Sequence, residues 1–121
     1  MIRVLIADDS PVARRLIKTI LKHDKRFEVV GEAKNGQEAI DLAKELSPDI
    51  ITMDIVMPVK QGLESAEEIL KFLKDVKIFL ISSMIDKDIE KKAKEIGLKG
   101  VIQKPFSSSD FIEELVNSVK E

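Results

Sequence analysis

Three carboxylates stand directly after apolar runs of the chain. Asp8 and Asp9 are adjacent and follow the run near the start, and Asp54 follows another run in the segment MDIVMP. Like charges at the end of a buried strand repel each other and need a counter-charge. Clustered oxygen ligands suit a hard divalent cation, with Mg²⁺ as the favoured ion. The acids therefore predict a Mg²⁺ site if the fold brings them together.

Groups that could bind phosphate stand at similar positions. Ser82 and Ser83 end the apolar run in LISSM, and Lys104 follows a further run in QKPF. A hydroxyl and an ammonium can hold phosphoryl oxygens. A carboxylate beside a metal ion can act as a nucleophile on phosphorus and form an aspartyl phosphate. A carboxylate such as Asp54 could therefore accept a phosphoryl group if these side chains meet.

Each of these residues also has a purely local explanation. The two opening acids could cap a helix that begins at Pro11, and Asp54 could be a turn residue. The serines could bond nearby backbone groups, and Lys104 could be a solvated surface side chain. These explanations must all hold independently, whereas a shared site requires one arrangement. We therefore favour the shared site.

The elements that would position these residues alternate along the chain. Short apolar runs predict strands at Ile2–Ala7, Phe27–Gly31, Asp49–Met53, Lys77–Ile81 and Gly100–Gln103. Apolar residues at helical spacing predict a helix from Pro11 and helices at Gln37–Leu46, Leu63–Leu73, Asp86–Ile96 and Ser109–Val119. Repeated strand–helix units predict one α/β domain over residues 1–121, with a parallel sheet covered on both faces. Ligands of such sheets bind beyond the carboxyl ends of the strands, where the candidate residues fall.

Local signals support two of the helix boundaries. Ser10 before Pro11 is typical of an N-cap followed by a proline at the first helical position, and Gly97 is typical of a C-cap. The first helix is expected to bury one apolar stripe. Its members are Val12, Leu16, Ile17, Ile20 and Leu21.

Composition narrows the classes of function. The 121 residues are 44% hydrophobic and 35% charged, and the net charge of −2 gives no basic field for nucleic acid. Without cysteine there is no disulfide or thiolate chemistry, and the single histidine cannot build a multi-histidine metal site. No apolar run is long enough for a membrane span, and we expect a cytoplasmic protein.

The ordered set IADDS, MDIVMP, Ser82 and KPF resembles the receiver domain of two-component response regulators over essentially the whole chain. The resemblance implies a flavodoxin-like, doubly wound sheet of five strands in the order 2-1-3-4-5 with five helices. It also implies that Asp54 is the phosphoacceptor. Asp9, Asp54 and the backbone carbonyl of Val56 would then bind Mg²⁺, and Asp8 would act through water.

The same resemblance assigns supporting roles. Ser82, at the family's usual spacing before Lys104, would be the switch hydroxyl, and Lys104 would clamp the phosphate. Ser83 would fill the small position that admits donors, and the Lys104–Pro105 peptide bond is often cis in relatives. Val101 stands where many relatives carry Tyr or Phe, so an aromatic rotamer switch is excluded there, and we expect coupling through the Ser82 loop.

The function implied is that of a signalling phosphoacceptor that turns over no metabolite. A histidine kinase would donate the phosphate, and the fourth helix, fifth strand and fifth helix would bind a downstream protein, with no nucleic acid or membrane partner. We expect a monomeric, stand-alone regulator, because segments such as GEAKNGQEA resemble chemotaxis-type receivers. Apolar Val56 and Met84 beside the acceptor cannot orient water, which predicts a long-lived aspartyl phosphate and only slow autodephosphorylation.

Other functions remain open on the sequence. The domain could belong to a larger regulator, serve as a phosphorelay intermediate, or act as an interaction module without phosphorylation. A Mg²⁺-dependent phosphatase of another α/β type would usually place a second acid two residues after its nucleophile, where this chain has Val56. Flavin binding on the same topology would need a hydroxyl-rich loop where the chain places Asp8 and Asp9.

Overall fold

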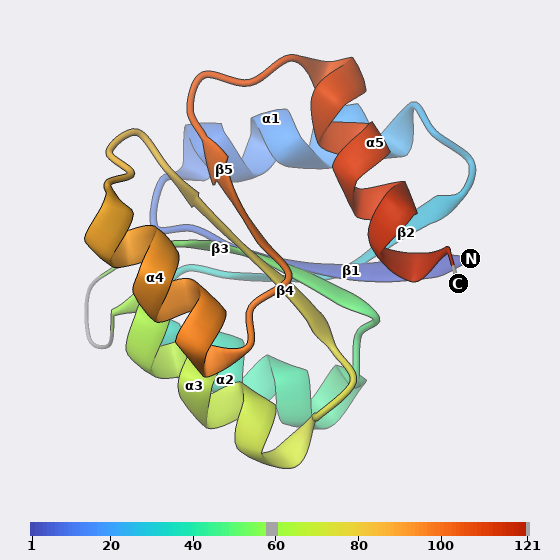
Figure 1. The fold of residues 1–121 in the computed structure, drawn as a ribbon. Helices are drawn as coiled ribbons and strands as arrows, with labels where there is room; N and C mark the ends of the chain where they lie inside the picture. The colour runs from blue at the N-terminus through green and yellow to red at the C-terminus, as the bar shows by residue number, and fades with distance from the viewer. Residues whose placement is uncertain (58–60, 121) are drawn as a thin grey trace.

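Five strands and five helices alternate strictly along the chain (Figure 1). The computed structural model describes residues 1–57 and 61–120, so Pro58 of the MDIVMP segment lies outside the described residues, as do Val59, Lys60 and Glu121. The elements are β1 (Ile2–Ala7), α1 (Pro11–Lys22), β2 (Phe27–Ala33), α2 (Gly36–Leu46), β3 (Ile50–Asp54), α3 (Gly62–Phe72), β4 (Lys77–Ser82), α4 (Lys87–Ile96), β5 (Gly100–Gln103) and α5 (Ser108–Val119).

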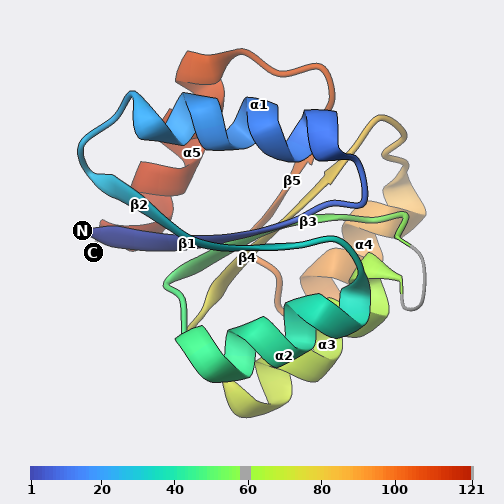
Figure 2. The same cartoon turned by 180° about the vertical axis from the view of Figure 1, so that it is seen from behind.

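The strands form one parallel sheet in the order β2-β1-β3-β4-β5, which confirms the predicted doubly wound topology. Helices α1 and α5 cover one face, and α2, α3 and α4 cover the other (Figures 1 and 2). Strand β2 lies on one side of β1 and β3 on the other. The helices that lead to these two strands, α1 and α2, lie on opposite faces of the sheet. The crevice between the carboxyl ends of β1 and β3 is therefore the switch point where such folds bind ligands.

Two hydrophobic cores lie on the two faces of the sheet. Successive strand residues point to opposite faces, so Val4 and Ile6 pack under α1 and α5 while Leu5 and Ala7 pack under α2 and α3. Helix α5 adds Phe111, whose side chain is fully buried. These cores hold the strands in a fixed register, and the register determines which residues meet at the sheet edge.

The boundaries of the elements differ from the sequence predictions by one or two residues. Strand β2 continues to Ala33 because Glu32 and Ala33 pair with Ile6 and Ala7 of β1. Helix α2 begins at Gly36 because the Asn35 side chain accepts a hydrogen bond from a backbone N–H of its first turn. The predicted Ser10 N-cap and the Gly97 C-cap, at φ 102°, are both confirmed.

The predicted apolar stripe of the first helix was wrong for two of its members. Ile17 and Leu21 are buried and Ile20 is partly buried, but Val12 is 76% exposed and Leu16 is 55% exposed. A single helix lying on a sheet covers it with one narrow face, and these two side chains lie outside that face of α1. Val12 and Leu16 are therefore exposed apolar side chains near the carboxyl ends of the strands.

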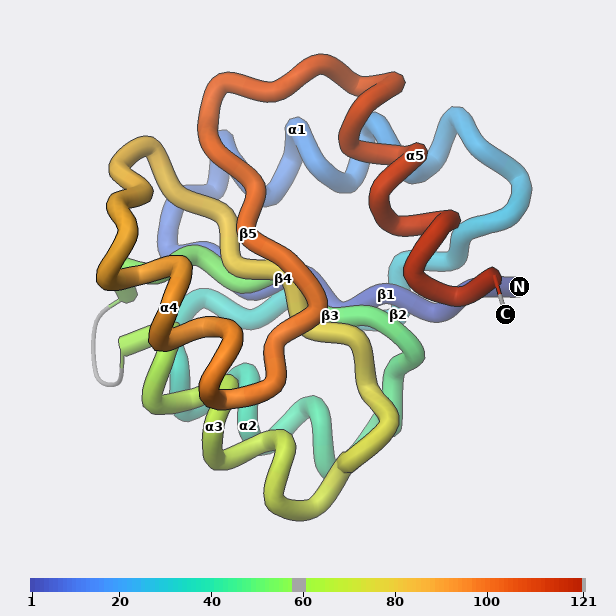
Figure 3. The backbone as a smooth tube through the Cα atoms, in the orientation of Figure 1, coloured from blue at the N-terminus to red at the C-terminus, as the bar shows by residue number. Residues whose placement is uncertain are grey.

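The two termini lie side by side, at the end of the molecule opposite the loops that follow β1 and β4 (Figure 3). Among residues 1–57 and 61–120, none of the helices has both the length and the apolar character that a bilayer crossing requires.

Candidate functional site

The three carboxylates predicted to meet do meet, at the switch point. Ala7 of β1 pairs with Met53 of β3, so the residues that follow them, Asp8 and Asp54, lie next to each other across the crevice. One carboxylate oxygen from each of Asp8, Asp9 and Asp54 lies within 4.8 Å of the others. Asp8 is buried, Asp54 is partly buried and Asp9 is exposed. The cluster is therefore open to solvent on the side of Asp9.

This cluster fits a divalent cation on chemical grounds. Its donors are all carboxylate oxygens, which are the ligands that Mg²⁺ prefers. Three acids at such a spacing carry more negative charge than the ammonium of Lys104, which pairs with Asp8, can balance. The one exposed member leaves room for ligands that the protein does not supply.

The surroundings of Asp54 disfavour its ionised form. Burial raises the pKa of the Asp54 carboxyl above its ordinary value, and the negative charge of Asp8 raises it further. Lys104 and the backbone N–H of Val56 act in the opposite direction and offset only part of the effect. The proposed acceptor is thus a carboxylate whose ionised form lacks a full counter-charge.

Asp8 is the most firmly held member of the cluster. Its Oδ1 accepts a hydrogen bond from the Ser10 N–H at 2.9 Å, and its Oδ2 lies 3.3 Å from Lys104 Nζ. Its N–H donates to the Ala33 carbonyl at 3.0 Å, and its carbonyl accepts from Arg14 Nη1 at 2.5 Å. A local bond from Ser10 and a long-range ion pair with Lys104 therefore coexist at Asp8, while Ser10 itself is the N-cap of α1.

Lys104 follows β5, the strand at the edge of the sheet, and its side chain extends to the acid cluster. Its backbone N–H donates to the Ser82 carbonyl at 2.8 Å, which extends the pairing of β4 and β5 beyond Gln103. The Lys104–Pro105 peptide bond is cis. Residues 96 positions apart, Asp8 and Lys104, therefore form an ion pair at one edge of the sheet.

The two serines at the end of β4 differ in burial and in contacts. Ser82 is 7% exposed, and its Oγ donates to the Met84 carbonyl at 3.3 Å and accepts from the Met84 N–H at 3.2 Å. Ser83 is exposed and lines a groove of about 380 Å³ with Lys104 and Pro105, below the exposed side chain of Leu16. The hydroxyl of Ser82 is thus engaged with its own loop rather than with Asp54.

Apolar side chains and a glycine complete the surroundings of Asp54. Val56 is 65% exposed and donates its N–H to Asp54 Oδ1 at 3.4 Å, and Met84 is 79% exposed. Gly62 opens α3 so close to β3 that a Cβ atom there would lie 2.2 Å from the Asp54 carbonyl oxygen. The glycine therefore allows α3 to approach the end of β3.

Sequence reasoning missed two side chains near the site. Arg14 binds the Asp8 carbonyl from α1, and its position one helical turn after Ser10 was the available signal. Thr52 Oγ1 is the buried side-chain oxygen that lacks a hydrogen-bond partner within the described residues. Thr52 lies two residues before Asp54 and therefore on the same face of β3, but nothing in its spacing marked it as unusual.

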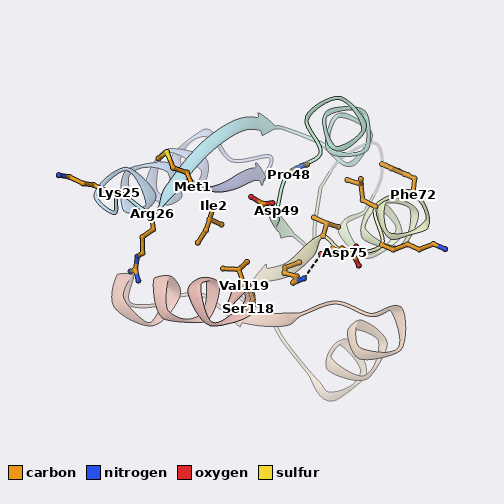
Figure 4. A pocket seen from close by; sticks show the side chains of 14 residues that line it. Met1, Ile2, Lys25, Arg26, Pro48, Asp49, Phe72, Asp75, Ser118 and Val119 are labelled. Atoms are coloured by element: carbon orange, nitrogen blue, oxygen red, sulfur yellow. Dashed lines mark hydrogen bonds between the residues drawn. The ribbon is translucent and has the colours of Figure 1, made fainter. Parts of the chain in front are cut away.

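A wider groove, of about 1110 Å³, lies at the opposite end of the sheet (Figure 4). It is bordered by Met1, Asp49, Phe72 and Asp75 near the amino ends of the strands, with Val119 from the end of α5. None of the clustered acids lines it. Cavity size therefore does not locate the chemistry in this fold, whereas the carboxyl ends of the strands do.

Comparison with known proteins identifies the class of fold and site. The response regulator receiver domain family matches residues 4–116, and the chain belongs to this family. The chemotaxis protein CheY of Thermotoga maritima is 42% identical over 113 residues, covering 93% of each chain. The CheY of Halobacterium salinarum is 39% identical over 111 residues, covering 92% of this chain and 91% of its own.

Solved structures agree with this assignment. The response regulator domain of Thermotoga maritima CheB has a TM-score of 0.90 at 34% identity, covering 98% of this chain and 96% of its own. The CheX–CheY–BeF3–Mg complex of Borrelia burgdorferi gives a TM-score of 0.93 at 26% identity, covering 98% and 90%. The chain is thus a CheY-type receiver domain of a two-component signalling family, as the sequence predicted.

Proposed function

We propose that this domain accepts a phosphoryl group on Asp54 in a Mg²⁺-dependent reaction and thereby switches a protein-binding surface. The convergence of three carboxylates at 4.8 Å, with Lys104 Nζ 3.3 Å from Asp8, is the observation that carries the proposal. Clustered acids next to a lysine ammonium suit a site that receives both a metal ion and a phosphate. A histidine kinase is the proposed donor.

The proposed metal ligands are the side chains of Asp9 and Asp54 and the backbone carbonyl of Val56, with Asp8 acting through water. A bound Mg²⁺ supplies positive charge that balances the acids and the phosphoryl oxygens. The donor set supports this assignment because it consists of oxygen atoms alone. Asp8, held by Ser10 and Lys104, is the member least free to move toward the ion.

The chain's own residues carry the transfer. A carboxylate oxygen of Asp54 attacks phosphorus, the P–O bond forms, and the P–N bond of a phosphohistidine donor breaks. The leaving imidazole keeps the electron pair and takes up a proton. Lys104 Nζ turns from Asp8 to a phosphoryl oxygen and stabilises the added charge.

The Ser82 hydroxyl provides the switch. The new phosphoryl oxygens are strong acceptors, and they draw Ser82 Oγ away from the Met84 N–H and carbonyl. The β4–α4 loop must then change its conformation, which biases an existing equilibrium rather than creating a new state. The small side chain of Ser83 leaves the approach to Asp54 open for a donor, and Pro105 supports the loop that carries Lys104.

Two surfaces suit the two classes of partner. The apolar side chains of Val12, Leu16, Val56 and Met84 are exposed, and Leu16 shares a groove with Ser83 and Lys104. These side chains offer a donor protein a docking area. The face formed by α4, β5 and α5 is the proposed site for a downstream protein, because it adjoins the β4–α4 loop. We propose no direct nucleic-acid or membrane partner.

We further propose that residues 1–121 form a single receiver domain that acts as a monomeric, cytoplasmic chemotaxis regulator. High coverage of both chains in the comparison with CheY proteins supports this. The receiver domain of a larger protein is the alternative, since a Myxococcus xanthus methylesterase is 40% identical over only 32% of its length. On either reading the domain catalyses its own phosphotransfer and slow autodephosphorylation only.

Intact mass after incubation with acetyl phosphate tests the proposal. Wild type should gain the mass of one phosphoryl group with Mg²⁺ and none with EDTA. Asp54→Ala should gain none, whereas Asp75→Ala, an exposed acid at the other end of the sheet, should behave as wild type. An adduct that persists in Asp54→Ala would show that the acceptor is wrong. Mg²⁺ binding without any adduct would favour a phosphate-independent interaction module.

A further inference from the structure

We propose that Arg14 is a positioning residue for the metal centre, acting through the backbone carbonyl that precedes Asp9. The inference rests on the proposed function, because it concerns the same Mg²⁺ site. Arg14 lies on α1 and, among residues 1–57 and 61–120, forms no ion pair with the three acid side chains; its side chain contacts the Asp8 carbonyl and Glu32. Its role is therefore to hold the ligand turn in place.

The Arg14 side chain binds the carbonyl that directly precedes Asp9. Its guanidinium Nη1 donates to the Asp8 carbonyl at 2.5 Å, and its own backbone N–H donates to the Ser10 carbonyl at 3.0 Å. Side chains of a helix lean toward its amino end, so a residue in the second turn of α1 can reach back to the turn before the helix. The side chain thus fixes the peptide group between Asp8 and Asp9, whereas the bond to Ser10 is the first backbone bond of α1 and does not depend on the side chain at this position.

A second contact fixes the guanidinium itself. Arg14 Nε lies 3.4 Å from Glu32 Oε1 on β2, and Lys18 Nζ lies 3.0 Å from Glu32 Oε2. The Arg14 side chain is 17% exposed and that of Glu32 is 34% exposed. An arginine can serve two acceptors at fixed angles because its guanidinium is a planar fork, which a lysine lacks. The ligand turn is therefore tied to β2 as well as to α1.

Asp9 needs this support more than the other acids do. Asp8 is held by bonds from Ser10 and Lys104, and Asp54 ends a paired strand. The Asp9 side chain is exposed and, within residues 1–57 and 61–120, makes no hydrogen bond or ion pair. Its direction depends on the backbone that Arg14 holds. Groups that orient metal ligands in this way change metal affinity by about 10- to 100-fold when removed.

Charge and positioning predict effects of opposite sign. Arg14 is cationic and close to the acids, so by charge alone its removal should make the site more negative and strengthen Mg²⁺ binding. If Arg14 positions the turn, its removal should weaken Mg²⁺ binding despite that gain. The direction of the change therefore separates the two roles.

Titration calorimetry with MgCl₂ on the intact 121-residue chain is the test. We expect Arg14→Gln to weaken Mg²⁺ binding by about tenfold or more. Arg14→Lys keeps the charge but not the fork, and should also bind more weakly than wild type. Arg15→Gln is the matched control, because Arg15 is the next residue of α1, is exposed and makes no ion pair among the described residues. It should bind within about twofold of wild type, since a solvated charge at the surface is strongly screened.

Glu32→Gln extends the test to the partner of Arg14. It loosens the guanidinium and should weaken Mg²⁺ binding, while the double variant with Arg14→Gln should be no weaker than Arg14→Gln alone. Thermal unfolding without Mg²⁺ checks that every variant is folded at the titration temperature, so that lost affinity reports the site and not the fold.

The outcomes distinguish a failure of the proposed function from a failure of the positioning role of Arg14. Wild type that binds no Mg²⁺ would overturn the proposed function itself. If wild type binds, Asp9→Asn does not, and Arg14→Gln binds as tightly as wild type or more tightly, the positioning role is wrong while the proposed function stands. Arg14→Lys equal to wild type would show that a single donor is enough and that the planar fork of the guanidinium is not required at this position.

Discussion

Replacing Asp54 with asparagine should stabilise the fold in the absence of Mg²⁺. The substitution keeps the size and shape of the side chain and removes one of three negative charges that lie within 4.8 Å of one another. The pKa of Asp54 is raised by burial and by Asp8, which means that its ionised form is disfavoured in the folded protein. Neutralising this position therefore removes a repulsion that unfolding would otherwise relieve.

The expected gain in stability follows from the distance between the charges. Two unit charges 4.8 Å apart repel by about 3.5 kcal/mol at an effective dielectric of about 20. Lys104 offsets part of this, and solvent at the partly exposed Asp54 screens more, so we expect a net gain of about 1–2 kcal/mol. For a domain of this size, that corresponds to a rise in Tm of between about 3 and 10 °C.

The pH dependence has a definite sign. A carboxyl whose pKa is raised by folding binds its proton more tightly in the folded state, so its contribution to stability is present at low pH. That contribution is lost as the pH rises from the unfolded pKa through the raised folded pKa. The advantage of Asp54→Asn over wild type should therefore be largest near neutral pH and should disappear on acidification.

Calorimetric melting in EDTA at a series of pH values measures this, with Asp75→Asn as the control for loss of one surface charge. Saturating Mg²⁺ should abolish the difference or reverse it, because wild type alone regains a full set of ligands. An Asp54→Asn variant no more stable than Asp75→Asn at neutral pH in EDTA would refute the reasoning. The acids would then be balanced without a metal ion.

Three further outcomes are expected. Gly62→Ala should lower the free energy of unfolding in urea by at least about 2–3 kcal/mol, because its Cβ would lie 2.2 Å from the Asp54 carbonyl oxygen. A urea midpoint equal to that of wild type would show that α3 shifts freely. Ser82→Ala should still take up phosphate by intact mass but should leave the Met84 amide resonance unmoved on phosphorylation; a wild-type shift would place the switch elsewhere. The aspartyl phosphate of wild type should decay slowly, and rapid loss would contradict that expectation. Replacing Val56 and Met84 with amide side chains should speed the loss by about tenfold, because an amide can orient the attacking water.

The sequence predicted the topology because its signals were local and consistent. Each strand is a short apolar run, each helix has a regular apolar face, and Ser10 and Gly97 mark helix ends with side-chain and backbone chemistry. Parallel order then places all carboxyl ends at one edge, so the meeting of Asp8, Asp54 and Lys104 could be expected without any long-range information.

Other features depended on contacts that no local pattern encodes. Val12 and Leu16 have the spacing of core residues, but whether they are covered depends on where α1 lies on the sheet. The Arg14 contact with the Asp8 carbonyl requires the turn geometry before α1, and its contact with Glu32 requires the pairing of β1 and β2. The bond between Ser82 and Met84 likewise follows from a loop conformation and not from residue type.

The acid cluster is expected to destabilise the metal-free fold and to bind Mg²⁺ for the same physical reason. The charge that the described residues leave unbalanced around Asp54 raises the free energy of the metal-free fold, and the same charge attracts a divalent cation. A ligand that binds only the folded state stabilises it by about 2.7 kcal/mol at a hundred times its Kd. Wild type should therefore gain more stability from Mg²⁺ than Asp54→Asn does, and the difference between these gains measures how strongly Asp54 contributes to the site. Arg14→Gln should reduce the gain of wild type without removing any acid, because it alters the direction of Asp9 and leaves the charge of the cluster intact.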